Sequence, residues 1–187
     1  QGAEPEGIVD KLDSAVVMTS RAGSTTPVTY SMVSKDELRG TNPLNSLPMA
    51  LALQPSVVSV NEGGTGLGYS KISVRGSKGA QINVTLNGIT LNDAESQEVF
   101  WVNIPALSNL LSSVQVQRGL GTSATGPGAF GASINMNTAS VGADAYGSVD
   151  IGYGSYNTFT ATATAGTGLT ESGVYFDMAY SRGMTDG

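Results

Sequence analysis

The stretch SSVQVQRGLGTSATGPGAFGASINMNT, residues 112–138, decides how this chain is interpreted. Its two ends are strand-like, and Gly, Ser, Thr and Asn interrupt it throughout, so it is no membrane helix. Arg118 is the only charged residue between Val99 and Ala143. An arginine in such surroundings lies either at the surface or against a carboxylate. Since no carboxylate is near in sequence, the stretch indicates a domain that sits inside another structure.

The composition excludes several classes of function. Nine Lys and Arg against 15 Asp and Glu give a net charge of −6, which argues against a protein that tracks nucleic-acid phosphates. The chain has no His and no Cys, so Ser-His-Asp chemistry, thiol catalysis and His or thiolate metal sites are excluded. We therefore expect no enzyme, no catalytic residues, no cofactor and no metal site.

Two local patterns have ordinary explanations. Gly126, Gly128 and Gly131 match the G-x-G-x-x-G dinucleotide pattern, but the next residues are strand-like where that motif needs a helix. Asp93 and its acidic neighbours at positions 95 and 98 could bind a cation. Closely spaced carboxylates after a hairpin are more often a solvated loop.

The first 140 residues predict an α+β domain with long Gly-rich connections. Ser34 and Glu37 form a capping box that opens a short helix. A second helix is predicted over residues 47–53, ending before Pro55, and a third within residues 105–111. Asn87-Gly88 predicts a tight hairpin between two strands.

The remainder of the chain alternates with a period of two over strands of about ten residues. The segments YGSVDIGYGSY, NTFTATATAG and GVYFDMAYSR, which begin at positions 146, 157 and 173, share this pattern. It is typical of transmembrane β-barrels and also fits a soluble antiparallel sheet. Three strands cannot close a barrel, so we interpret the chain as the N-terminal part of a longer protein.

Six motifs occur in an order that resembles a TonB-dependent outer-membrane receptor. They are LDSAVVMT from residue 12, LPMAL from 47, ISVRG from 72, LNGITL from 86, VQVQRG from 114 and GAFGASIN from 128. The resemblance implies an α+β plug with a small mixed sheet, then the first antiparallel strands of a barrel of about 22 strands. The implied division is a flexible segment over residues 1–24, a plug over 25–140 and barrel strands over 141–187.

The resemblance also implies a function. Such receptors take up a scarce nutrient across the outer membrane of Gram-negative bacteria, with a ferric siderophore or similar iron complex as the first candidate. The implied partners are the periplasmic domain of TonB, the rest of the barrel, membrane lipid and the nutrient, and no nucleic acid. The alternative is a surface or secreted β-rich binding module, which would keep the alternating strands as a water-soluble sheet.

Three sets of residues are carried over from the family. The box that would add a strand to TonB, over residues 12–19, comprises Leu12, Asp13, Ser14, Ala15, Val16, Val17, Met18 and Thr19. Arg75 and Arg118 each precede a Gly after a predicted strand and would lock the plug to glutamates of the barrel wall, the alternative being that they bind carbonyls or face solvent. The predicted ligand-facing residues, on loops 61–70 and 92–103, are Glu62, Tyr69, Asn92, Asp93, Glu95, Gln97, Phe100 and Trp101.

Overall fold

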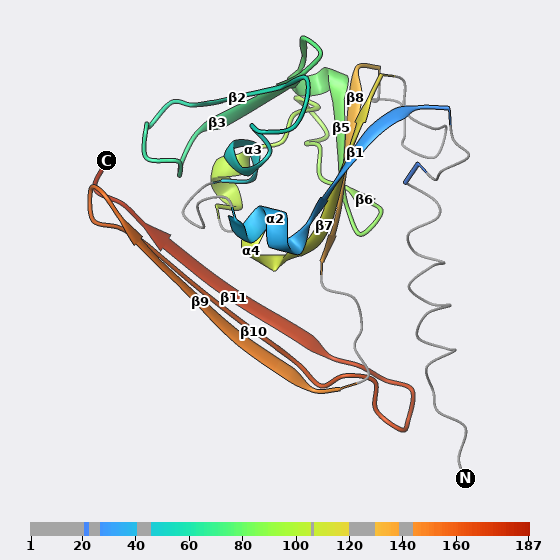
Figure 1. Ribbon diagram of the computed structural model, residues 1–187, viewed down its shortest axis with the longest axis vertical. Helices are drawn as coiled ribbons and strands as arrows, with labels where there is room; N and C mark the ends of the chain where they lie inside the picture. The colour runs from blue at the N-terminus through green and yellow to red at the C-terminus, as the bar shows by residue number, and fades with distance from the viewer. Residues whose placement is uncertain (1–20, 23–26, 41–45, 106, 120–129, 139–143) are drawn as a thin grey trace.

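The computed structural model describes residues 21–22, 27–40, 46–105, 107–119, 130–138 and 144–187. The described residues form three sheets and a few short helices, which confirms the predicted α+β fold (Figure 1). The predicted box over residues 12–19 and the Gly-rich residues 120–129 lie outside the described residues.

A five-stranded sheet is the centre of the fold. Its strand order is β1-β7-β8-β5-β6, and β5 runs parallel to β8 while the other neighbours are antiparallel. The sheet is therefore mixed, as predicted. Its strands are β1 (Thr29–Ser34), β5 (Ile82–Leu86), β6 (Ile89–Thr90), β7 (Leu111–Arg118) and β8 (Ala132–Thr138).

One face of this sheet is apolar because alternate residues of each strand point the same way. Val114 and Val116 of β7, Ile134 of β8 and Val84 of β5 are all at most 2% exposed. The helix α3 (Leu47–Ala50) packs on this side, between the sheet and β2–β3 (Figure 1). These contacts form the hydrophobic core, which Leu51 and Trp101 complete.

The opposite face of the same sheet is polar and also buried. It presents Gln115 and Gln117 of β7, Asn135 of β8 and Thr85 of β5, each at most 3% exposed. The hydroxyl of Thr85 donates to Asn135 Oδ1 over 2.8 Å. Amide and hydroxyl side chains remain buried where hydrogen bonds replace those to water. The strands thus alternate between an apolar core and a buried polar layer, in which hydrogen bonds such as Thr85–Asn135 and Gln117–Gln115 join neighbouring side chains.

The short helices agree with the sequence signals with one difference. The capping box is confirmed, since Ser34 N donates to Glu37 Oε2 over 2.7 Å and α2 (Lys35–Gly40) begins there. The third helix is α4 (Leu107–Leu110). The helix predicted over residues 47–53 is shorter, because α3 ends at Ala50 and i→i+3 bonds continue the chain as turns. Ser46 precedes α3, and its hydroxyl is bonded to the Ser70 hydroxyl over 2.7 Å rather than to the backbone of the helix.

A second sheet stands beside the core. It has the order β2-β3-β4, all antiparallel, with β2 (Val57–Asn61), β3 (Ser70–Val74) and β4 (Ser77–Lys78). A 3-10 helix, η1 (Gly79–Gln81), leads from β4 into β5. The hairpin between β5 and β6 turns at Asn87 and Gly88, with φ of 50° and 82°, as the Asn-Gly pair predicts.

The third sheet comprises β9 (Tyr146–Gly154), β10 (Thr158–Gly166) and β11 (Asp177–Met184), all antiparallel. It lies as a long separate layer beside α2 and α4 (Figure 1). Thr160 and Thr162 on its inner face are buried, whereas Ile151 and Tyr180 on its outer face are about 70% and 64% exposed. The expected alternation is present, with the apolar side turned outward.

Two boundaries concern this third sheet. The division expected near residue 140 falls between the end of β8 and the start of β9. The third alternating segment was expected to begin as a strand at residue 173, but β11 begins at Asp177, because Thr170 and Val174 close a turn through Gly173, whose φ is 74°. Among the described residues, none of the helices has both the length and the apolar character needed to cross a membrane.

Candidate functional site

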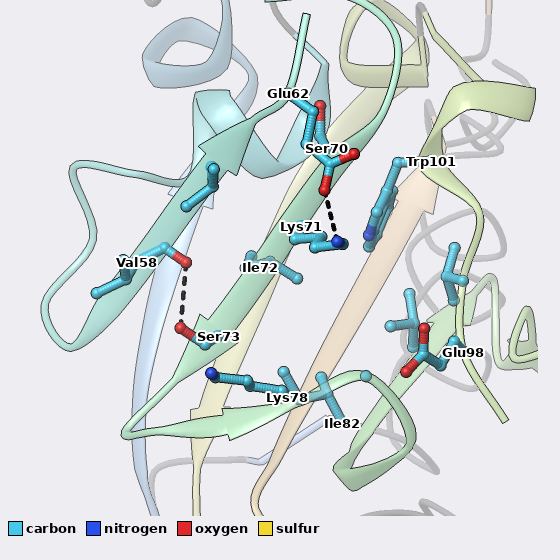
Figure 2. Close-up of a pocket in the computed structure, with 14 residues that line it drawn as sticks. Val58, Glu62, Ser70, Lys71, Ile72, Ser73, Lys78, Ile82, Glu98 and Trp101 are labelled. Atoms are coloured by element: carbon cyan, nitrogen blue, oxygen red, sulfur yellow. Dashed lines mark hydrogen bonds and ion pairs between the residues drawn. The ribbon is translucent and has the colours of Figure 1, made fainter. Parts of the chain in front are cut away.

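A cleft of about 520 Å³ lies between β3 and the segment after the β5–β6 hairpin (Figure 2). It joins parts of both loops that were predicted to meet a ligand. Apolar side chains form most of its lining, and charged groups stand among them. The lining residues are Val58, Val60, Glu62, Ser70, Lys71, Ile72, Ser73, Lys78, Gly79, Ile82, Val84, Glu98, Val99 and Trp101.

The sheet side of the cleft is built by alternation along β2 and β3. Val58 and Val60 keep 62% and 53% of their surface exposed on β2. Next to Val60 in the register, Lys71 forms an ion pair with Glu62 over 2.5 Å (Figure 2). This hydrogen bond from Lys71 to the Glu62 carboxylate raises the pKa of the lysine. The exposed pair gives this wall a polar upper edge above the valines.

The opposite side of the cleft comes from residues 98–101. Trp101, the first residue of the 3-10 helix η2 (Trp101–Asn103), is 5% exposed and packs in the core while it lines the cleft. Glu98 approaches Gly79 so closely that a Cβ added to Gly79 would lie 2.0 Å from Glu98 Oε1. Figure 2 shows Trp101 and Glu98 facing β3 from this side. An apolar floor with a few charged groups at its edge is the usual character of a small-molecule site.

Asn92 holds the loop that carries this wall. Its amide donates to Ile82 O over 2.9 Å and to Gln97 O over 2.7 Å, and its Oδ1 accepts from Val84 N over 2.8 Å. The side chain therefore fastens the loop to β5, and its hydrogen-bonding groups are engaged within the protein. Asn92 therefore holds the loop in place without lining the cleft itself.

Asp93 orders the next turn of the same loop. Its Oδ2 accepts from the backbone amides of Glu95 and Ser96 over 3.0 and 2.8 Å, and from the Ser96 hydroxyl over 3.0 Å. The hydrogen bond from the Ser96 amide is the largest cause that lowers the pKa of Asp93. The carboxylate thus works as a local cap for the turn.

The structure separates the eight predicted ligand-facing residues into three groups. Glu62 and Trp101 line the cleft, while Asn92 and Asp93 are bonded within the loop. The remaining four are exposed but do not line the cleft: Tyr69, Glu95, Gln97 and Phe100. Sequence reasoning missed Lys71, Lys78 and Glu98 as cleft residues. Alternation along β3 could have indicated Lys71, but the approach of Glu98 depends on tertiary packing.

Arg118 ends β7 on the core face and is 7% exposed. Its Nε donates to Pro55 O over 2.8 Å, and its Nη2 donates to the Ser31 hydroxyl. Arg75, whose φ is 51°, donates from Nη1 to Arg118 O over 3.3 Å. Burial, and then the charge of Arg75, lowers the pKa of Arg118. Within the described part of the chain, both arginines bind carbonyls and neither is paired with a carboxylate.

Arg21 and Ala22 attach the beginning of the described chain to the polar face of the central sheet. The Gln115 carboxamide accepts from Ala22 N over 2.8 Å and donates to Ala22 O over 2.9 Å. The Arg21 guanidinium donates to the Ser113 hydroxyl over 3.0 Å and to Asn135 O over 3.3 Å. This attachment follows the predicted box over residues 12–19 closely in sequence. In the sequence, only the alternating glutamines of VQVQRG indicate that this face of β7 is polar.

The sequence matches the family model of the TonB-dependent receptor plug domain over residues 22–133, which are 112 of its 187 residues. The chain belongs to the TonB-dependent receptor plug family. The expected resemblance is therefore confirmed, and the five-stranded sheet, its helices and the cleft all lie in or at the edge of the plug. A comparison with curated protein sequences found no match.

Solved structures of TonB-dependent receptors share the fold. The ferric yersiniabactin uptake receptor FyuA from Yersinia pestis is 20% identical with a TM-score of 0.64, over 87% of this chain and 25% of that one. The alcaligin outer-membrane receptor FauA from Bordetella pertussis is 20% identical with a TM-score of 0.63, over 87% and 27%. The copper transporter OprC is 16% identical with a TM-score of 0.65, over 84% and 24%.

The likeness extends beyond the plug. The chain spans about a quarter of the length of these receptors. Residues 1–138, which end with β8, make up about three quarters of the chain, so a match over 87% of it must include part of the segment with β9–β11. The plug and at least part of the β9–β11 segment thus have counterparts in the known receptors.

Proposed function

We propose that this chain is the plug and first barrel strands of a TonB-dependent outer-membrane transporter in a Gram-negative bacterium. The match of residues 22–133 to the plug family is the observation that carries the proposal. The apolar outer face of β9–β11 supports it, because strands that cross a membrane turn apolar side chains to the lipid and small polar ones inward. A soluble binding module, the alternative, would gain nothing from exposing that face to water.

The proposed cargo is a ferric siderophore or similar iron complex. Support comes from the fold shared with FyuA and FauA, whose names refer to ferric yersiniabactin and to alcaligin. OprC, named as a copper transporter, has the same fold, so copper is the second candidate. We propose that the cargo contacts the plug at the cleft, where Lys78 and the exposed Lys71–Glu62 pair stand beside the indole of Trp101 and an anionic complex would compete with Glu62 for Lys71.

The proposed coupling runs through the box and the attachment behind it. TonB would add residues 12–19 to its sheet through main-chain hydrogen bonds, which require an extended segment. The next described residues, Arg21 and Ala22, are bonded to β7 and β8, so a pull on the box would reach the central sheet there. Arg75 and Arg118 are proposed to meet glutamates of the barrel wall, since the described residues bring two guanidiniums together without a carboxylate.

Uptake and binding measured side by side test this proposal in the full-length receptor. In iron-limited cells that have no other route for the complex, Val17→Pro should abolish energised uptake of the radiolabelled ferric siderophore and leave surface binding intact, because Pro removes an amide donor. Lys71→Ala should weaken binding and uptake together. Val17→Ala is the matched control. If the Val17→Pro receptor takes up the complex at the wild-type rate, the proposed coupling is wrong.

A further inference from the structure

The helix α2 of the plug contacts the third sheet through a pair of opposite charges. Arg39 Nη2 lies 3.2 Å from Asp150 Oδ2 of β9, across 111 positions of sequence. The side chains are 41% and 31% exposed, so water reaches both. Beside them, Asn109 Nδ2 donates to the Thr162 hydroxyl of β10 over 3.3 Å. Among the described residues, Arg39–Asp150 is the one ion pair that joins the plug to β9–β11.

The local sequence of α2 determines which face it presents. Leu38 is 3% exposed and packs in the core, which fixes the rotation of the helix. Lys35 and Arg39 are four residues apart and therefore lie on the same face. Glu37 is held at the start of the helix by Ser34 and does not compete for them. The helix thus turns two cations, one turn apart, toward the third sheet.

Two carboxylates, those of Asp150 and Asp177, lie on the inner face of the third sheet. Asp150 pairs in register with Thr162, which is 1% exposed. Asp177 pairs with Gly166, and a Cβ added to Gly166 would lie 2.1 Å from Asp177 Oδ1, so this carboxylate also covers the inner face. Lys35 and Asp177 line one cavity of about 210 Å³ between the plug and the sheet. That space holds roughly seven waters at liquid volume.

We propose that α2 and the inner face of β9–β11 form an electrostatic latch between the plug and the barrel wall. Its Arg39–Asp150 rung is closed, while Lys35 and Asp177 line the neighbouring cavity, where Asp177 accepts a hydrogen bond from the Tyr146 hydroxyl. A partly exposed ion pair holds weakly and is screened by salt, in contrast to a buried one. The ion pair of the latch therefore holds the plug against β9–β11 at rest and breaks when the plug is displaced. The proposal rests on the proposed function only in taking β9–β11 as part of the wall around the plug.

The latch differs in place from the arginines predicted as locks. Arg118 is at the far end of β7 from α4, about 23 Å along a strand of eight residues. In the described residues its guanidinium reaches Ser31 and Pro55 of the plug and no residue of β9–β11. The latch at Arg39 and the proposed lock at Arg118 would therefore hold different sides of the plug. A substitution at one of these arginines leaves the contacts of the other in place.

Thiol labelling at the seam tests the latch. The chain has no Cys, so Ser148→Cys, a nearly isosteric change on the cavity wall, creates a single reporter in a full-length receptor cleared of other cysteines. Arg39→Asp and Asp150→Arg should each speed labelling by up to about fivefold, and the double exchange should restore the original rate. Lys78→Asp, an equal charge change on β4, is the matched control and should leave the rate of thiol labelling unchanged. Raising the salt concentration should speed labelling of the otherwise unchanged receptor.

The outcomes separate clearly. Three results would each overturn the latch. They are a labelling rate in both single variants equal to that of the Ser148→Cys receptor alone, a double exchange that fails to restore this rate, and the same acceleration in Lys78→Asp. If a charge reversal prevents folding, Arg39→Gln and the salt dependence of the Ser148→Cys receptor decide the matter, and a salt-independent rate overturns it. The assay needs neither TonB nor a nutrient, so its failure is distinct from a failure of energised uptake.

Discussion

Gln115→Leu should detach the start of the plug from its central sheet. The Gln115 side chain is 2% exposed and clamps both backbone groups of Ala22, over 2.8 and 2.9 Å. Leucine has a similar volume and no polar atoms, so it fills the space without either bond. The predicted effect is local opening at Ala22, while the Arg21 guanidinium keeps its bonds to Ser113.

The two hydrogen bonds to Ala22 set the size of the local effect. The variant also removes the bond that Gln115 Oε1 accepts from Gln117 Nε2 over 2.7 Å, which does not involve Ala22. A typical intramolecular hydrogen bond contributes about 0.5–1.5 kcal/mol net. Because Ala22 can lift from the sheet and regain water, its amide and carbonyl are not left buried, and the larger penalty for an unsatisfied group does not apply. The free energy of opening should therefore fall by about 2 kcal/mol, which corresponds to a roughly 30-fold larger equilibrium constant for opening.

Amide hydrogen exchange measures this opening directly. In the full-length receptor in micelles, the Ala22 amide of Gln115→Leu should exchange roughly 30-fold faster than in the wild type. Gln54→Leu, the same change at a position that does not touch Ala22, should leave that rate unaltered. An unchanged rate in Gln115→Leu would refute the clamp, and so would an equal acceleration in Gln54→Leu.

Two further predictions concern charged residues of the plug. If Arg118 meets a barrel-wall glutamate as proposed, Arg118→Ala should raise the passive permeability of the full-length receptor to small solutes and lower its thermal stability, since removing one partner of a buried pair costs about 3–5 kcal/mol; if neither permeability nor melting temperature changes, Arg118 is no lock. The lowered pKa of Asp93 means that its ionised form stabilises the fold above the ordinary carboxyl pKa and that this contribution is lost as pH falls through the lower, folded value. Amide exchange at Ser96 should therefore quicken on acidification in the wild type, and Asp93→Asn should remove most of that pH dependence.

Local features could be predicted from sequence because local chemistry decides them. The Ser34–Glu37 capping box starts α2, and Asn87-Gly88 turns the β5–β6 hairpin, since each depends on residues at most three positions apart. The alternation of residues 146–166 likewise predicts β9 and β10 with distinct faces. The family itself could be recognised from six short motifs in order.

The partners of the charged side chains depend on contacts that no local pattern encodes. Arg39 meets Asp150 across 111 positions, whereas Arg118, the arginine that stands out in the sequence, binds Ser31 and the Pro55 carbonyl. Glu98 joins the cleft because the chain returns to Gly79, while its neighbour Asp93 turns inward to cap its own loop.

The sequence by itself thus determined the elements, their faces and the family, because periodicity and turn chemistry act between near neighbours. Only the tertiary structure decided which charges meet and which polar groups are buried, because those depend on where distant strands and helices are brought together by the core.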